Sequence, residues 1–323
     1  MAGSRALKNR IRSTKNIRQI TRAMEAVSAV KMRKSQAVAI ATRPYALTAF
    51  SILRAIRASS DQTLAASPLV QKRPVKNSCL VVITSDKGLA GSFNTNVIKQ
   101  AEKLISQLEH SDILQNIRMS DTGVKVSIVA IGKKGRDYFA RRGRTILGEF
   151  LGAGDFGAID ETRKISDFLL KLFGEKKTDE VTLVYTNFIS ALKQEVVVRS
   201  ILPFSEESLQ SIVDSIVPLE GRYANIPRSM ELAGVKEGVL KFEPSPKDVL
   251  ERLLPKFLAV EVYHAILEAN ASEHSSRMIA MKNASDNAAE LAEALNIQFN
   301  KNRQAAITKE LSEITAGREA LSQ

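Results

Sequence analysis

The sequence predicts a mixed α/β fold: a long antiparallel coiled coil of the N- and C-terminal helices beside a three-layer α/β domain. Two glycine-free stretches predict the helices. One follows Gly3 and runs to about residue 58, and the other runs from Ser245 to Gly317. Between them, short apolar runs alternate with helical patterns, which is typical of a largely parallel sheet covered by helices.

The C-terminal helix is expected from about residue 246 to 318, roughly 110 Å at about 1.5 Å per residue. Ser245 before Pro246 predicts an N-cap with proline in the first turn, and Gly317 marks the expected end. Pro255 should kink this helix without ending it. Residues that step alternately by three and four predict a coiled-coil seam. They are Leu250, Leu253, Phe257, Val260, His264, Leu267, Ala271, His274, Met278, Met281, Ser285, Ala288, Ala292, Leu295 and Phe299.

The N-terminal helix is rich in alanine and is expected to break or bend near Pro44. Its predicted buried face is interrupted by Lys31 and Lys34. That face consists of Ile17, Ile20, Met24, Val27, Val38, Ala41, Tyr45 and Ile52. Two long helices with seams at opposite ends of a chain are expected to pair antiparallel with each other.

The middle of the chain divides into strands and helices. Strands are predicted at 79–85, 124–132, 180–186 and 194–202, and helices at 94–109, 133–141 and 160–173. A surface loop is expected at 110–122 and a short helix at 205–217. The predicted division is an N-terminal helix (1–59), a linker (60–75), an α/β domain (76–205), an irregular connection (206–243) and a C-terminal helix (244–323).

The net charge of +12 resides in one element. Residues 1–58 hold thirteen Lys or Arg against the single Glu25, and the rest of the chain carries thirty-four charges of each sign. Such a helix should bind an acidic surface. No run of about 18 apolar residues predicts a membrane span. The N-terminus also lacks an apolar signal segment, so the chain is expected to be intracellular. The single cysteine, Cys79, excludes an intrachain disulfide and is expected in the core.

Few residue patterns in the sequence support a catalytic role. The segment ITSDKGLAGSFN (83–94) runs from a strand through a glycine turn, but Gly88 and Gly91 match neither the dinucleotide fingerprint nor the P-loop. Tight turning explains these glycines better. The three histidines, His110, His264 and His274, lack metal-ligand spacing, and no nucleophile–base set is evident around Asp286 or elsewhere. No catalytic residue, cofactor or metal is therefore expected.

The basic helix admits two interpretations. It is either a solvated charged face or a docking surface. Met24 and Met32 accompany Lys31, Arg33 and Lys34, and this mixture of apolar groups and positive charge suits an acidic, partly apolar protein surface better than a phosphate backbone.

Three stretches resemble the gamma subunit of rotary ATP synthases, over nearly the whole chain. They are IRSTKNIRQITRAMEAVSAVKMRKSQ (11–36), ITSDKGLAGSFN (83–94) with IGKKGRDYF (131–139), and RMIAMKNASDNAAEL (277–291) with RQAAITKELSEITAG (303–317). The resemblance implies two terminal helices in an antiparallel coil beside a Rossmann-like domain that binds no nucleotide. It also implies a non-catalytic rotor shaft that couples ion flow across a membrane to ATP chemistry on the beta subunits.

The resemblance further implies partners and contact residues. The partners are the alpha and beta subunits of the catalytic head, the epsilon subunit and the membrane ring of c subunits, with no nucleic acid and no insertion into the membrane. Met24, Arg33 and Lys34 match residues near acidic loops of the catalytic subunits. Arg303, Gln304 and Thr308 match residues that hydrogen-bond a loop of one beta subunit. Contact by both Arg303 and Gln304 requires that the helix has left its partner there.

Some positions depart from the family pattern. The central turn reads Gly88-Leu89-Ala90-Gly91-Ser92 instead of Gly-Leu-Cys-Gly-Gly, and the regulatory cysteine insert of the chloroplast form is absent. The expected location is peripheral, on the cytoplasmic face of a bacterial plasma membrane or on an organellar inner membrane. A basic coiled-coil protein that binds nucleic acid is the alternative favoured by a pI of about 9.7, although no nucleic-acid-reading motif is present. A nucleotide-dependent enzyme is disfavoured by the glycine spacing.

Overall fold

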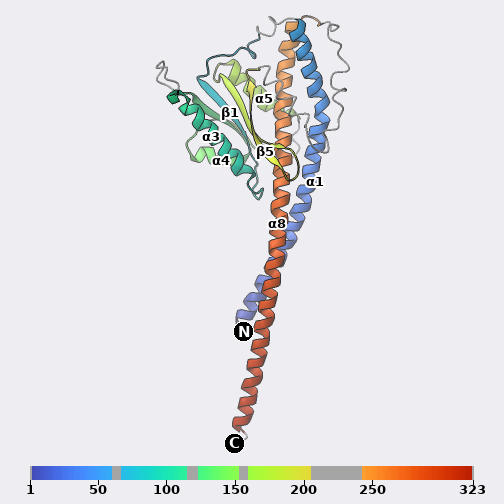
Figure 1. Cartoon of the computed structure of the whole chain (residues 1–323), viewed down its shortest axis with the longest axis vertical. Helices are drawn as coiled ribbons and strands as arrows, with labels where there is room; N and C mark the ends of the chain where they lie inside the picture. The colour runs from blue at the N-terminus through green and yellow to red at the C-terminus, as the bar shows by residue number, and fades with distance from the viewer. Residues whose placement is uncertain (1, 60–66, 115–122, 153–158, 205–241, 322–323) are drawn as a thin grey trace. The chain divides into compact units, whose positions relative to one another are not determined.

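The computed structural model describes residues 2–59, 67–114, 123–152, 159–204 and 242–321 (Figure 1). The chain divides into two units. We call Met1–Ala29 with Arg277–Gln323 the paired-helix unit, and Val30–Ser276 the sheet unit. Helices α1 (Ala2–Ser59) and α8 (Pro246–Leu321) each contribute residues to both units. The five-part division expected from the sequence stays a prediction.

Helix α8 begins where its cap predicts and ends later than expected. The Asp248 backbone N–H donates to Ser245 Oγ at 3.2 Å, and Ser245 Oγ donates to the Asp248 carboxylate at 2.6 Å. The N-cap is therefore confirmed, and α8 continues through Pro255. The expected end at Gly317 is wrong, since α8 runs to Leu321. An exposed glycine costs a helix only about 1 kcal/mol relative to alanine, and the strong helix formers around it keep the helix going.

The predicted seam of α8 is confirmed, because each of its members is buried or half-buried. In the sheet unit α8 is surrounded: from Phe257 to Ala269 all residues but half-buried Ala259 are buried. In the paired-helix unit burial is confined to one face, and from residue 300 to 318 every residue is exposed.

The predicted buried face of α1 is wrong at three of its four positions in the paired-helix unit, where only Met24 is half-buried, and at Ala41 in the sheet unit, which is exposed. Ile17, Ile20 and Val27 are 50%, 60% and 54% exposed. Between residues 5 and 42 of α1, the buried positions are mainly small or hydroxyl-bearing residues at heptad spacing. They are Ile11, Thr14, Ser28, Met32, Ser35 and Ala39. Small side chains let two helices approach closely. The hydroxyls can also hydrogen-bond to backbone carbonyls of their own helix. Ser28 Oγ, for example, donates to the Met24 carbonyl at 2.7 Å.

The two long helices pack together and run antiparallel (Figure 1). In the sheet unit Ala39 of α1 packs with Tyr263 and Leu267 of α8. Helix α1 continues through Pro44 without ending there. None of the helices in the described part of the chain is both long and apolar enough to cross a membrane.

The five-stranded sheet has the order β3-β2-β1-β4-β5. The strands pair in parallel except for the antiparallel pair β4–β5, which confirms the largely parallel sheet. Their bounds are β1 Asn77–Ile83, β2 Lys125–Ile131, β3 Ile146–Phe150, β4 Glu180–Phe188 and β5 Gln194–Leu202. Strand β3 was not predicted. It is a five-residue edge strand with alternating partial exposure and a central glycine, and such a segment gives little apolar signal.

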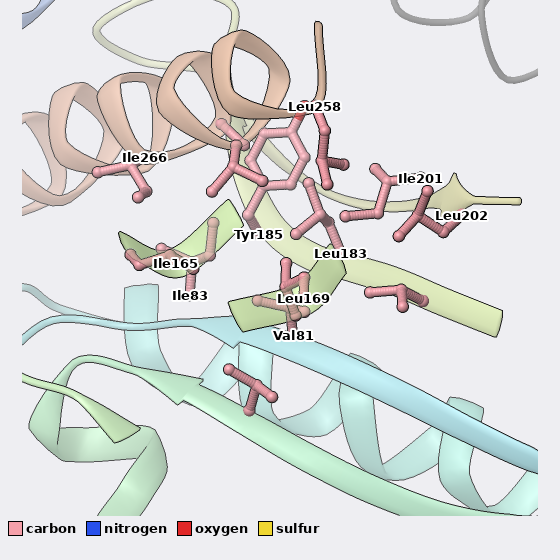
Figure 2. Packing of buried hydrophobic residues seen from close by; sticks show 14 of the residues in the cluster. Val81, Ile83, Ile165, Leu169, Leu183, Tyr185, Ile201, Leu202, Leu258 and Ile266 are labelled. Carbon is pink, nitrogen blue, oxygen red and sulfur yellow. The ribbon is translucent and has the colours of Figure 1, made fainter. Parts of the chain in front are cut away.

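Helices cover both faces of the sheet, which confirms the three-layer arrangement. Helices α3 (Phe93–Leu114) and α4 (Lys133–Arg141) pack on Leu80 and Val82 of β1. Helix α5 (Ile159–Gly174) and the first part of α8 pack on the opposite face, where Val81, Ile83 and Tyr185 point (Figure 2). Because α3 extends to Leu114, residues 110–114 are helical and not loop. The short helix expected at 205–217 falls outside the described residues.

Candidate protein-binding surfaces

The exposed face of α1 in the paired-helix unit combines apolar and basic side chains. Ile17, Ile20 and Val27 lie on it, and exposed Arg18 and Arg22 lie between them in the sequence. Sequence reasoning assigned these large apolar residues to the buried seam, so this surface was missed. The available signal was an alternative heptad that begins at Ile11 and includes the small or hydroxyl-bearing residues Thr14, Ser28 and Ser35. Large apolar side chains at the surface of a helix are typical of an interface with another protein.

The predicted contact residues of α1 fall in both units. Met24 belongs to the paired-helix unit and is half-buried, whereas Arg33 and Lys34 belong to the sheet unit and are exposed. The buried residues Met32 and Ser35 flank that basic pair along the helix. Arg33 and Lys34 thus belong to the exposed side of α1, where a guanidinium and an ammonium group can meet an acidic partner.

The end of α8 presents the second group of predicted contact residues. Arg303, Gln304 and Thr308 are all exposed, and the Thr308 hydroxyl donates to the Gln304 carbonyl at 3.0 Å. Ile307 and Leu311 in the same stretch are 49% and 60% exposed. This stretch is a regular helix that buries no face in the described part of the chain, so its donors and its apolar residues are open to a partner.

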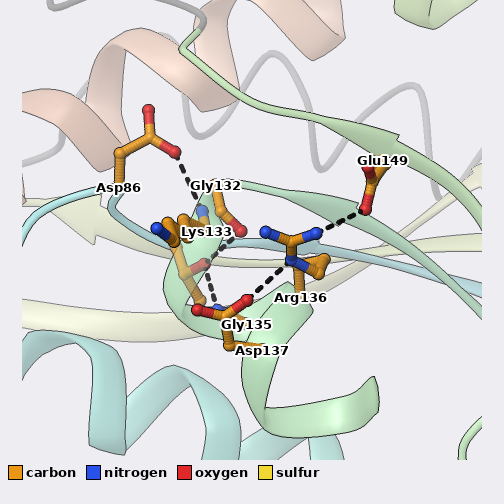
Figure 3. Close-up of polar contacts among 8 residues, drawn as sticks. Asp86, Gly132, Lys133, Gly135, Arg136, Asp137 and Glu149 are labelled. Atoms are coloured by element: carbon orange, nitrogen blue, oxygen red, sulfur yellow. Dashed lines mark hydrogen bonds and ion pairs between the residues drawn. The ribbon is translucent and has the colours of Figure 1, made fainter.

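The carboxyl edge of the sheet is where related α/β folds bind phosphate, and here the chain fills that position itself (Figure 3). The first three backbone N–H groups of α4 donate to residues that follow β1. Lys133 N–H donates to Asp86 Oδ1 at 2.9 Å, Lys134 N–H to the Ser85 carbonyl at 3.0 Å, and Gly135 N–H to Thr84 Oγ1 at 2.8 Å. The negative charge that a helix N-terminus favours is supplied by Asp86.

Gly132 makes this close approach possible. Its φ is +93°, and a Cβ at this position would lie 2.0 Å from the Thr84 carbonyl oxygen. In the turn after β1 the left-handed residues are Leu89 and Gly91, with φ of 64° and 56°. The glycine-containing segment therefore serves a tight turn and a close backbone contact.

Helix α8 closes the same edge above β4 and β5. Ser272 Oγ donates to the Thr186 carbonyl at 3.2 Å, Ser275 Oγ to the Ala191 carbonyl at 2.6 Å, and Ser276 Oγ to Gln194 Oε1 at 2.9 Å. These bonds seat the helix on the strand ends.

The described residues offer no evident metal site. No cluster of three or more His, Cys, Asp or Glu side chains able to hold a metal ion occurs there. His264 and His274 are buried in α8 at 3% and 2% exposure, and Asp286 is exposed. Burial raises the pKa of the Cys79 thiol to about 12, so this cysteine is an inert core residue.

Comparison with known sequences gives one family. The family model described as "ATP synthase" matches residues 3–321. The ATP synthase gamma chain of Moorella thermoacetica is 39% identical over 321 residues, which span 99% of this chain and 100% of that protein. The ATP synthase gamma chain of Trichormus variabilis is 36% identical over 326 residues and is covered in full by the alignment, as is this chain.

Solved structures share the fold. A chain from the mitochondrial ATP synthase of Euglena gracilis, in a structure of its OSCP, F1 and c-ring, has a TM-score of 0.62 at 21% identity, covering 99% of this chain and 95% of that one. A chain from the central stalk and c-ring structure of the Tetrahymena thermophila enzyme has a TM-score of 0.56 at 22% identity, covering 82% and 99%.

Proposed function

The chain belongs to the family of ATP synthase gamma chains, and from this premise we propose that it is the central rotor shaft of a rotary ATP synthase. Ion flow through a membrane sector turns the shaft, and the shaft couples this rotation to ATP synthesis or hydrolysis on the beta subunits. The chain itself catalyses no reaction.

One observation carries this proposal. Residues 300–318 of α8 form a helix whose every residue is exposed, and Ile307, Leu311 and Ile314 are among them. A helix of this kind buries its apolar residues only when a partner surrounds it. We propose that the partner is the ring of alpha and beta subunits.

The sheet unit supports a non-catalytic role. Thr84, Ser85 and Asp86 accept the N–H groups at the start of α4, and the serines of α8 occupy the adjacent strand ends. Phosphate would have to displace the Asp86 carboxylate to reach that helix N-terminus. Isothermal titration of ATP into the full chain should show no binding, and micromolar affinity would contradict this part of the proposal.

The basic side of α1 is proposed to meet acidic loops of the catalytic subunits through Met24, Arg33 and Lys34. Reversing two charges, Arg33→Glu with Lys34→Glu, should weaken ATP-driven ion pumping of the assembled complex. Each exposed pair contributes only about 0–1 kcal/mol, so the double reversal is needed. Reversal of exposed Lys103 and Lys125 of the sheet unit changes the net charge equally and is the matched control. Wild-type pumping by the variant with Arg33→Glu and Lys34→Glu would remove these two residues from the coupling role.

At the end of α8, Arg303, Gln304 and Thr308 are proposed to hydrogen-bond a loop of one beta subunit. Charge-assisted hydrogen bonds contribute about 1.5–3 kcal/mol each, enough to change a rotary dwell by more than about tenfold. Arg303→Ala with Gln304→Ala should therefore lower ATPase turnover of the assembled complex. The neighbouring exposed pair offers the control Lys301→Ala with Asn302→Ala, which should keep wild-type turnover. Wild-type turnover and dwell times in single-molecule rotation of the first variant would show the contact to be dispensable.

The remaining partners and the location follow from the same proposal. The epsilon subunit and the membrane ring of c subunits are proposed to bind the sheet unit. The chain is proposed to lie peripherally on the cytoplasmic face of a bacterial membrane, without entering the bilayer. A basic coiled-coil protein that binds nucleic acid is not favoured, because the family match spans residues 3–321. Purification from native membranes should recover the chain together with ATPase subunits.

A further inference from the structure

Five ionisable side chains are buried in the sheet unit where α8 meets strands β4 and β5. Glu261, His264 and Glu268 project from α8, and Tyr185 and Arg199 come from β4 and β5. Their exposed fractions lie between 0% and 8%. Charged residues are seldom buried to this degree unless they are paired. The cluster lies beside the apolar core of this face.

Four of the five groups are joined in two close contacts. His264 Nδ1 lies 3.4 Å from Glu268 Oε1, and the guanidinium carbon of Arg199 lies 5.6 Å from the centre of the Tyr185 ring. Burial raises the pKa of Tyr185 well above its ordinary value, and the nearby Glu268 carboxylate raises it further. The Tyr185 hydroxyl is therefore neutral at physiological pH.

Glu261 is the exception. It is 2% exposed, and neither carboxyl oxygen makes a hydrogen bond of accepted geometry with any described residue. Its neighbours along α8, Leu258, Val262 and Ala265, belong to the apolar core. An ionised carboxylate in such a place lacks both water and hydrogen-bond donors, which is costly.

We propose that Glu261 is a proton-binding site at the joint between α8 and the sheet, and that loss of its proton loosens α8 from β4 and β5. The positive charge of Arg199 on β5 lowers the pKa of Glu261 and so favours its ionised form. Tyr185 on β4 is a neutral neighbour. On α8 itself, ionised Glu261 would add negative charge near Glu268, with His264 one turn away.

The balance of these effects gives the direction of the pH dependence. Burial raises the pKa of Glu261 to about 8, against the opposing effect of Arg199. An unfolded glutamate has a pKa of about 4.3. Between these two pH values the native chain holds a proton that the unfolded chain has lost. The contribution of this proton to the free energy of unfolding is therefore complete below about pH 4.3 and declines as the pH rises to about 8. The ratio of folded to unfolded chain should fall about tenfold per pH unit across this range.

Infrared spectroscopy of the full chain tests the proton directly. A protonated carboxylic acid has a carbonyl stretching band distinct from that of a carboxylate. We expect this band at pH 7, its loss above about pH 8, and its absence at pH 7 in Glu261→Gln. The control Glu251→Gln, at an exposed position of the same helix, should keep it. A wild-type chain without the band at pH 7 would overturn the proposal, whether or not the glutamine variant folds.

Denaturant unfolding between pH 5 and 9 tests the consequence. Glutamine keeps the shape of protonated glutamate and does not ionise, so Glu261→Gln should remove most of the decline in stability that the wild type and Glu251→Gln show. Native-state hydrogen exchange should localise this difference to the α8 amides from 257 to 269. The same pH slope in wild type and Glu261→Gln would refute the role of Glu261. The experiments concern the chain alone, so their outcome is independent of the proposed rotor function.

Discussion

Two stretches of α8 share one helix and one seam spacing but differ in what surrounds them. From Phe257 to Ala269 the helix is buried on nearly every side by the sheet, α5 and α1. In the paired-helix unit it buries one narrow face, of which Ala288 and Leu295 are members, and beyond residue 299 it buries none. Both stretches repeat apolar residues at three- and four-residue steps. A seam therefore identifies the side of a helix that will pack, but not how much of the helix will be covered.

The two stretches of α8 also differ in what holds them in place. The surrounded stretch is fixed by a core of large side chains and by serine hydroxyls that bond neighbouring strands. The exposed stretch lacks such anchors among the described residues, and its surface apolar groups suit an external partner. Three pairs of matched substitutions, one in each environment, test this difference in order of expected effect.

The largest difference should come from truncating leucines. Leu254 is fully buried, whereas Leu311 is 60% exposed. Leu254→Ala should lower the free energy of unfolding by about 2–5 kcal/mol, since it removes packing and leaves a cavity. Leu311→Ala should change it by less than about 0.5 kcal/mol. Denaturant titration of the full chain measures both. Equal effects would mean that the end of α8 is covered within the isolated chain.

A smaller difference is expected from enlarging alanines. Ala288 lies on the seam at 7% exposure, and Ala294, six residues later, is exposed. Ala288→Leu should destabilise the paired helices by about 1–3 kcal/mol, because the close packing has no room for three more carbons. Ala294→Leu should be nearly neutral. Thermal unfolding followed by circular dichroism distinguishes the two, and a stabilising Ala288→Leu would show that the seam is loosely packed.

The smallest difference concerns hydroxyls. Ser272 Oγ donates across to the Thr186 carbonyl at 3.2 Å, and Thr315 Oγ1 donates within its own helix to the Leu311 carbonyl at 2.8 Å. Ser272→Ala should reduce the free energy of unfolding by about 1 kcal/mol, since it leaves a buried carbonyl without its partner. Thr315→Ala should be neutral or slightly stabilising, because alanine is the better helix former. Similar losses in both variants would contradict an anchoring role for Ser272.

Local patterns determined much of this protein. The N-cap at Ser245, the seam of α8, the helix at 133–141 and the strand at 194–202 all follow from spacing and composition over a few turns or residues. These features depend on backbone hydrogen bonds and on side chains close in the sequence, so the sequence alone sufficed. The exposed positions of Arg303, Gln304 and Thr308 agree with the requirement that α8 has left its partner there.

Tertiary structure decided what lies opposite each element. Only packing chose the seam of Thr14, Ser28 and Ser35 over Ile17 and Ile20, because close approach of two helices outweighs the burial of larger side chains. Only packing brought Asp86 to the start of α4, 47 residues away, and enclosed Glu261 among apolar side chains. These outcomes depend on which residues, distant in the sequence, come into contact. The periodicity of one segment does not identify the segment that packs against it.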